Sequence, residues 1–93
     1  MENQTFQIER NRIVLYSSEG RLLAEITFPE QPDGTVSINH TFVDDSLRGK
    51  GIAGQLVQKT AELLRSDGRK ACPTCSYAVK WFEKNPGYND ILL

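Results

Sequence analysis

The chain has 93 residues, of which 39% are hydrophobic and 25% charged, and its formal net charge is −1. This length allows a single domain, residues 1–93, and the composition is that of a globular chain rather than a disordered one. A near-neutral charge argues against nucleic acid as a partner, because a phosphate backbone requires a clustered basic surface.

Targeting signals are not evident in the sequence. No apolar run approaches the roughly 20 residues that span a bilayer, and Met1 to Gln4 lack the basic and apolar regions of a secretion signal. The two cysteines are therefore expected to be free thiols in a reducing compartment. We expect a cytoplasmic protein that does not bind membranes and that is a monomer.

Charge is unevenly distributed along the chain. Residues 1–46 carry three cations against eight acids, whereas residues 47–84 carry eight cations against three acids. The second half therefore favours an anionic ligand, and the acidic first half can attract a cationic acceptor such as an amine.

Four strands are predicted in the first half of the chain, as an antiparallel meander. Period-2 alternation marks residues 5–10, 13–17, 21–29 and 36–43, and polar or glycine-containing turns separate these runs. In the fourth run one face collects Val36, Ile38, His40 and Phe42. This alternation predicts that His40 shares a face with core residues.

The second half of the chain is predicted to be helix, strand and helix. Apolar residues recur at helical spacing from about residue 49 to 65, and Gly68 is placed to stop that helix. A short strand at 69–72 follows, which Pro73 ends or confines to an edge. Ser76 is the expected cap of a last helix at 77–84, closed by residues 85–87. The predicted fold class is α+β, with a mostly antiparallel sheet of four or five strands.

The glycine-rich segment Arg48-Gly49-Lys50-Gly51-Ile52-Ala53-Gly54 lies between the fourth strand and the long helix. Glycines let the backbone approach a ligand closely, and a helix start presents free N–H groups and a partial positive charge. The segment therefore predicts a phosphate cradle, with a ligand-free turn as the alternative. A Rossmann site and a Walker P-loop are disfavoured, because G-x-G-x-x-G and G-x-x-x-x-G-K-[ST] are both absent.

Arg48-x-x-Gly51-x-Ala53 resembles the acetyl-CoA pyrophosphate-binding signature of the GNAT superfamily of N-acetyltransferases. The segments at 40–43 and 72–77, the latter reading C-x-x-C-S-Y, are similar to those of a compact, single-domain branch, as is Asn85-Pro86. The resemblance implies a GNAT-like fold and acetyl-CoA or coenzyme A as the cofactor. It also implies an open acceptor site, because residues 5–43 leave no room for the helices that typical GNAT domains insert there.

The same resemblance implies which residues contact the cofactor. Main-chain groups at 41–43 would pair with the pantetheine arm, and the glycine-rich loop would hold the pyrophosphate. An ordinary half-buried strand is the alternative for 41–43, since those contacts are main-chain. The expected cofactor contacts are Thr41, Phe42, Val43, Arg48, Gly49, Lys50, Gly51, Ile52, Ala53, Gly54, Ser76 and Asn85.

Cys75 and His40 are the catalytic candidates. Thiolates are strong nucleophiles, and the N-terminus of the last helix would favour a thiolate at Cys75. Cys75 can carry the acetyl group, or an amine can attack acetyl-CoA directly while Cys75 only lines the cofactor tunnel. Histidine suits general acid–base work near neutral pH. His40 can therefore deprotonate the acceptor or orient Cys75, and a hydrogen-bonded core histidine is the alternative.

Other interpretations of these residues remain open. Cys72 and Cys75 form a C-x-x-C pair, but the single histidine is too little to complete a usual zinc site, so no metal is expected. A thiol–disulfide redox pair is disfavoured, because the strand followed directly by a long helix that is usual for such a motif is missing. Glu25 and Asn85 are reserve candidates for acceptor contact or proton handling, with a solvated and a turn-capping role as the respective alternatives.

The sequence thus predicts an acetyl-CoA-binding N-acetyltransferase that transfers acetyl to an amine, either a small molecule or a peptide lysine. The alternative function is a regulatory module that binds acyl-CoA with little or no turnover.

Overall fold

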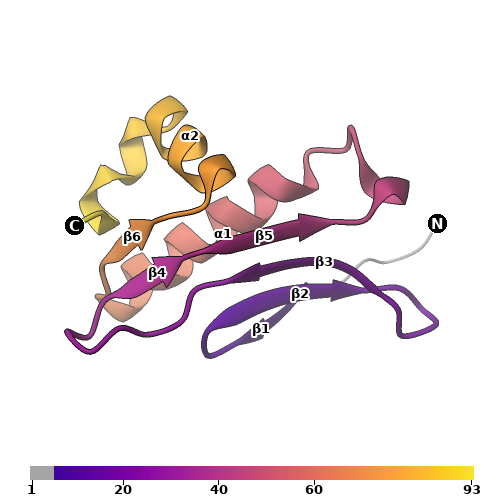
Figure 1. The fold of residues 1–93 in the computed structure, drawn as a ribbon, viewed down its shortest axis with the longest axis horizontal. Helices are drawn as coiled ribbons and strands as arrows, with labels where there is room; N and C mark the ends of the chain where they lie inside the picture. Colours follow the sequence, from indigo (N-terminus) through magenta and orange to yellow (C-terminus); the bar gives the residue numbers. More distant parts are fainter. Residues whose placement is uncertain (1–5) are drawn as a thin grey trace.

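Residues 6–93 are described by a computed structural model; Met1 to Gln4, on which the leader prediction rests, and Thr5, the expected start of the first strand, lie outside them. Figure 1 shows a sheet with a long helix behind it and the C-terminal segment folded over one end. Its strands are β1 (Phe6–Glu9), β2 (Arg12–Tyr16), β3 (Leu22–Thr27) and β5 (His40–Val43). They run antiparallel in the order β1-β2-β3-β5, which confirms the predicted meander.

Two short strands form a separate parallel pair. β4 (Val36–Ile38) pairs with β6 (Ala71–Pro73), and Pro73 is the last residue of β6, as predicted. β4 leads almost directly into β5, which pairs with β3 instead. One run of chain therefore links the two sheets, and β5 forms the edge of the larger one.

The helices follow the predicted order with shifted boundaries. α1 (Ile52–Asp67) ends at Gly68, whose φ is +72°, and a 3₁₀ turn, η1 (Asp45–Leu47), precedes it. α2 (Ser76–Lys84) is followed by a second 3₁₀ segment, η2 (Pro86–Ile91). Within residues 6–93, neither α-helix has the length and apolar character needed to cross a membrane.

The cap of α2 differs from the prediction. Cys75, not Ser76, is the N-cap residue, because its Sγ accepts the Ala78 N–H at 3.4 Å. Ser76 is instead the first helical residue and is exposed. A thiol thus satisfies one of the free amides that every helix start presents.

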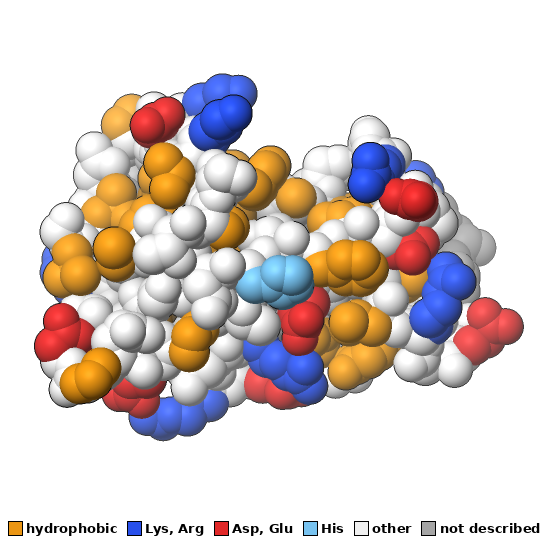
Figure 2. Space-filling model, viewed as in Figure 1, with side chains coloured by type: hydrophobic (Ala, Val, Ile, Leu, Met, Phe, Trp, Pro, Cys, Tyr) orange, Lys and Arg blue, Asp and Glu red, His pale blue; other side chains and the backbone are white. Residues whose placement is uncertain are grey.

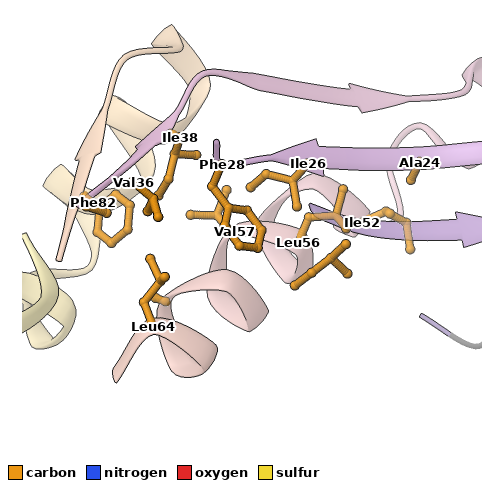
Figure 3. Packing of buried hydrophobic residues seen from close by; sticks show 14 of the residues in the cluster. Ala24, Ile26, Phe28, Val36, Ile38, Ile52, Leu56, Val57, Leu64 and Phe82 are labelled. Atoms are coloured by element: carbon orange, nitrogen blue, oxygen red, sulfur yellow. The ribbon is translucent and has the colours of Figure 1, made fainter. Parts of the chain in front are cut away.

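The hydrophobic core lies between the larger sheet and α1 (Figure 3). α1 packs against β3 and β5. Full burial of each large aliphatic side chain contributes about 1.5–3 kcal/mol to the stability of the fold. Leu47 and Ile52, on either side of the glycine-rich loop, are both buried. The core therefore anchors the loop at both ends while Arg48 to Gly51 stay exposed.

The prediction that His40 and Phe42 share a face with Val36 and Ile38 is wrong. Asn39 N–H donates to the Thr27 carbonyl, while His40 also pairs with Thr27 in the register, so two residues oppose one. This is a β-bulge, and one extra residue reverses the alternation that follows it. Val36 and Ile38 are buried, whereas His40 and Phe42 are exposed.

His40 and Phe42 consequently lie on the sheet face opposite α1, called the outer face below. They share it with their cross-strand partners Thr27 and Glu25, because residues that pair across an antiparallel sheet point to the same side. Figure 2 shows the single histidine exposed on this face. The core-histidine alternative is therefore excluded.

An ion pair ties the C-terminal segment to α1. Arg65 Nη2 lies 2.6 Å from Asp90 Oδ1, and Arg65 Nε lies 2.8 Å from Oδ2. The hydrogen bonds from Arg65 hold the pKa of the Asp90 carboxyl below its ordinary value. A lowered folded-state pKa stabilises the fold above the unfolded value of about 3.9, and this stability is lost as the pH falls through the lowered value.

Asp90→Asn is therefore expected to lower the thermal unfolding midpoint at pH 7, and the difference from wild type should shrink as the pH falls toward the lowered pKa. Thermal melts followed by circular dichroism at several pH values measure this. An equal shift at pH 7 and at pH 2 would show that the Asp90 charge is not what stabilises the segment.

Candidate functional site

The glycine-rich loop has the backbone geometry of an anion cradle. Gly49 and Gly51 have φ of +82° and +72°, a left-handed conformation that disfavours residues with a side chain. The first amide–carbonyl bond into α1 runs from Gln55 N–H to the Gly51 carbonyl. The amides of Ile52, Ala53 and Gly54 therefore precede the helical ladder and point out of the helix start.

Two cations flank this helix start. Arg48 Nε lies 2.8 Å from Asp45 Oδ1, and the two side chains are 76% and 88% exposed. Exposed pairs of this kind are worth at most about 1 kcal/mol, so a phosphate can compete for Arg48. Lys50 is likewise exposed. The loop thus offers backbone amides and two exposed positive charges to the same ligand.

A cavity of about 180 Å³ leads from the loop toward β5. Its walls include Gly49, Ala53, Val43 and Tyr77, so it joins the cradle to the end of β5 and to α2. Gly54 has no side chain, and a Cβ at this position would lie only 3.4 Å from the Tyr77 hydroxyl oxygen. The glycine therefore lets α2 pack closely against α1.

The outer edge of β5 presents main-chain groups beyond this cavity. Asp44 N–H donates to the Leu23 carbonyl, so by antiparallel alternation the main-chain groups of Phe42 face β3. Those of Thr41 and Val43 face away from β3. Of the three predicted main-chain contacts, Thr41 and Val43 are thus placed toward the edge, and Phe42 is not.

The pairing of β4 with β6 ends at Ile38, and from there β5 and β6 lead in different directions. The Ile38 carbonyl accepts the N–H groups of both Thr74 and Cys75, at 2.9 and 3.1 Å, and the chain then turns into α2. In Figure 1, β6 leads into α2 on one side while β5 continues along the sheet. Asn39, at the bulge, directly follows Ile38 and therefore lies at this parting point.

The side chain of Cys75 contacts both β5 and α2. Its Sγ lies 3.5 Å from Thr41 Oγ1 and accepts the Ala78 N–H. Cys75 is half-buried, Cys72 is exposed, and both are free thiols. Within residues 6–93, no group of three or more metal-ligating side chains is arranged to hold a metal.

His40 and Glu25 lie on the outer face, away from the thiol. Thr41, the neighbour of His40, is the β5 residue that contacts Cys75, so the side chain of His40 projects to the opposite face. His40 therefore does not orient Cys75 in this structure. The Glu25 carboxylate, 16% exposed, lies 2.9 Å from Arg12 Nη1, which gives it an ion-pair role.

Asn85 takes the turn-capping role. Its side-chain N–H donates to the Trp81 carbonyl at 2.7 Å, and its backbone N–H donates to the Phe82 carbonyl. Both bonds satisfy carbonyls at the end of α2. The side chain of Asn85 is thus engaged at the C-terminus of α2, whereas the thiol of Cys75 lies at its N-terminus.

The family model for GCN5-related N-acetyl-transferases matches residues 12–91. This range includes every strand except β1, the glycine-rich loop and both α-helices. The chain belongs to the GCN5-related N-acetyltransferase (GNAT) family.

Solved GNAT structures share this fold. A GCN5-like protein from Staphylococcus aureus, known from its solution structure, superposes with a TM-score of 0.81 at 31% identity, covering 100% of this chain and 91% of that one. YhbS from Escherichia coli, a GNAT N-acetyltransferase solved with CoA, gives 0.62 at 24% identity, covering 74% of this chain and 42% of that one. The α+β, GNAT-like fold class is confirmed.

Curated relatives match over a shorter stretch. Protein NATD1 of Xenopus tropicalis is 38% identical over 52 residues, which is 56% of this chain and 48% of that protein. The human protein of the same name is 37% identical over 51 residues, 55% of this chain and 45% of that protein. The chain spans about half the length of the curated relatives it matches.

One residue of this GNAT site was not anticipated from the sequence. Tyr77 is 42% exposed, and its hydroxyl lies over Gly54 at the wall of the loop cavity. The available signal was a glycine within the first turn of α1, which indicates that another element packs closely there. Helical periodicity does not reveal which residue packs on it.

Proposed function

We propose that this GNAT domain is an acetyl-CoA-dependent N-acetyltransferase that transfers acetyl directly to a primary amine. The observation that carries the proposal is the cavity that joins the glycine-rich loop at the start of α1 to Val43 on β5 and Tyr77 on α2. Thr41, on the same strand as Val43, contacts Cys75 at the start of α2. The cradle end suits phosphate. His40 lies next to Thr41 on β5, with its side chain on the outer face of the sheet.

The residues present fit the proposed cofactor. A Cβ built at Gly49 or Gly51 meets no atom of residues 6–93 within 4 Å, so the space in front of both glycines is open to a ligand. The amides of Ile52 to Gly54 and the Arg48 side chain would hold the pyrophosphate, and the edge groups of Thr41 and Val43 would hold the pantetheine arm. YhbS, which has the same fold, was solved in complex with CoA, which supports CoA as the ligand of this fold.

Acetyl-CoA supplies a thioester, whose acyl carbon accepts a nitrogen lone pair and whose sulfur leaves as a thiolate. The attacking amine must first lose a proton, because an ammonium has no free lone pair. We assign this proton to the imidazole of His40, which is exposed on the outer face beside the bulge at Asn39. His40 is thus the proposed general base.

Cys75 is proposed to position its neighbours rather than to carry the acetyl group. Its Sγ already accepts the Ala78 N–H and contacts Thr41 Oγ1, so it holds the start of α2 against β5. Direct transfer needs no nucleophile at this position, because the amine performs the attack.

Cys75→Ser is expected to retain transfer within about tenfold of wild type, since a hydroxyl can also cap the helix. Steady-state rates with a primary amine measure this, and intact mass after incubation with acetyl-CoA alone should show no stable adduct. An acetyl adduct on wild type that disappears in Cys75→Ser, together with lost transfer, would establish the covalent route instead.

The proposed function is tested by incubating the protein with acetyl-CoA and a panel of primary amines and measuring N-acetylated product by mass spectrometry. We expect product above the uncatalysed rate for at least one amine. Saturable acetyl-CoA binding with no transfer to any amine would favour the regulatory binding module.

A further inference from the structure

Two hydrogen-bond donors of α2 lie beside the start of α1. A Cβ built at Gly54 would lie 3.4 Å from the Tyr77 hydroxyl oxygen and 3.6 Å from Trp81 Nε1. Gly54 is in the first turn of α1, and the Cα–Cβ direction of a helical residue tilts toward the helix N-terminus. Both donors therefore lie close to the helix start whose free amides form the cradle.

The fold uses neither of these donors. Within residues 6–93, no group hydrogen-bonds to the Tyr77 hydroxyl or to the Trp81 indole N–H. Tyr77 is 42% exposed, and the half-buried Trp81 leaves its Nε1 accessible to solvent. An indole nitrogen can only donate, whereas a phenol hydroxyl can donate or accept. An oxygen of a ligand can therefore replace water at both groups without breaking a bond of the protein.

Ring contacts hold Trp81 in this orientation. The centroid of its ring lies 5.1 Å from that of Phe82 and 5.3 Å from that of Tyr88. Tyr88 is itself fixed to α1, because its hydroxyl donates to Glu62 at 3.0 Å and the Arg65 guanidinium lies 4.7 Å from its ring centroid. A group that is already held in place loses little conformational freedom when a ligand binds. The indole N–H is thus preorganised beside the start of α1.

The cavity beside the loop indicates which part of the cofactor these donors meet. Tyr77 on α2 and Val43 on β5 both line it, so an arm that leaves the loop for the edge of β5 passes Tyr77. The pyrophosphate already has donors in the loop amides and the Arg48 side chain. The pantetheine arm carries two amide carbonyls and a hydroxyl, which are neutral acceptors and match neutral donors. Trp81 follows Tyr77 by one helical turn, so both can contact the same arm.

We propose that the Tyr77 hydroxyl and the Trp81 indole N–H donate to oxygens of the pantetheine arm where it leaves the pyrophosphate. α2 then forms one wall of the cofactor site and the edge of β5 forms the other. Tyr77 and Trp81 are binding residues in this assignment. The inference rests on the cofactor of the proposed function, but it does not depend on turnover.

Calorimetric titration of Tyr77→Phe and Trp81→Phe with two ligands tests the proposal, because each variant removes one donor and keeps an aromatic ring. One ligand is CoA, and the other is adenosine 3′-phosphate 5′-diphosphate, which keeps the pyrophosphate but lacks the arm. Each variant should bind CoA about two- to tenfold more weakly than wild type, and the double variant about tenfold or more. The affinity for the nucleotide should not change. Equal weakening of both ligands, or unchanged CoA affinity in the folded variants, would overturn the proposal.

Tyr16→Phe is the matched control for the loss of a phenol hydroxyl. Tyr16 is on β2, which β3 separates from β5 in the sheet, so its hydroxyl lies outside the proposed site. This variant should bind CoA with wild-type affinity. If Tyr16→Phe weakened CoA as much as Tyr77→Phe does, the loss would not come from a contact on α2, and the role of Tyr77 would be refuted.

The wild-type protein provides a test that does not depend on the folding of a variant. Trp81 is the only tryptophan of the chain, so its indole N–H gives a single resonance in the ¹⁵N-labelled protein. CoA should shift the indole proton downfield, as expected when a hydrogen bond forms, and the nucleotide without the arm should not. If CoA shifts the amides of Gly49 and Gly51 but leaves the indole resonance in place, the assignment of Trp81 is wrong.

These measurements separate the inference from the proposed function. The expected indole shift together with no acetyl transfer to any amine would refute the enzyme and leave the arm contact in place. CoA binding at the loop with no effect of either substitution would refute the arm contact and leave the enzyme in place. Absence of CoA binding to the wild type would refute both.

Discussion

Gly51→Val is expected to weaken acetyl-CoA binding at least about a hundredfold, because two hydrogen bonds to a charged phosphate, lost together, cost about 3 kcal/mol or more. Gly51 has φ of +72° and is the N-cap of α1. A branched residue resists this conformation, and its Cβ would project into the open space in front of the cradle. Calorimetric titration of the variant with acetyl-CoA measures the effect.

Gly34→Val is the matched control. Gly34 has a similar φ of +87° and equally open surroundings, but it lies in the turn before β4, away from the loop. Both variants should lose comparable stability, about 1–2 kcal/mol, from the strained backbone. Only Gly51→Val should lose binding. Equal loss of affinity in the two variants would mean that destabilisation, not the cradle, explains the result.

His40→Gln is expected to reduce acetyl transfer by about 10² or more while leaving acetyl-CoA affinity unchanged, since general-base catalysis contributes about 10²–10⁴. The side chain is exposed, so the substitution should change stability by less than about 0.5 kcal/mol. Comparing kcat with the calorimetric Kd for acetyl-CoA separates the two effects.

Chemical rescue provides the control for His40. In His40→Ala, added imidazole should restore part of the lost rate, because the exposed position leaves room for it, whereas it should not accelerate the wild type. If His40→Gln transfers acetyl at the wild-type rate, the base is another group or the solvent, and the proposed role of His40 is wrong.

Patterns that depend on near neighbours in the chain allowed most of the fold to be predicted. Alternation predicted the meander, and Gly68 and Pro73 end α1 and β6 where their backbone constraints require. The bulge at Asn39 was missed, because it arises from how two residues pair with Thr27 on another strand. Period-2 counting across 36–43 therefore assigned His40 to the wrong face.

The candidate site also contains features that the local sequence encodes and features that it does not. Gly49 and Gly51 mark the cradle in the sequence because their φ values are ones that other residues avoid. The approach of Thr41 to Cys75 results from a contact between distant segments of the chain. No local spacing encodes such a contact, so it was not predicted.

Acetyl-CoA binding is the most direct test of the proposed function. Titration of the ¹⁵N-labelled protein with acetyl-CoA, followed by intact mass spectrometry, should show saturable binding to one site. The expected shifts are those of the Gly49, Gly51 and Ala53 amides, extending to Thr41, with no stable acetyl adduct on the protein. Absence of binding, or shifts confined to other parts of the chain, would contradict the assignment of the glycine-rich loop as a cofactor cradle.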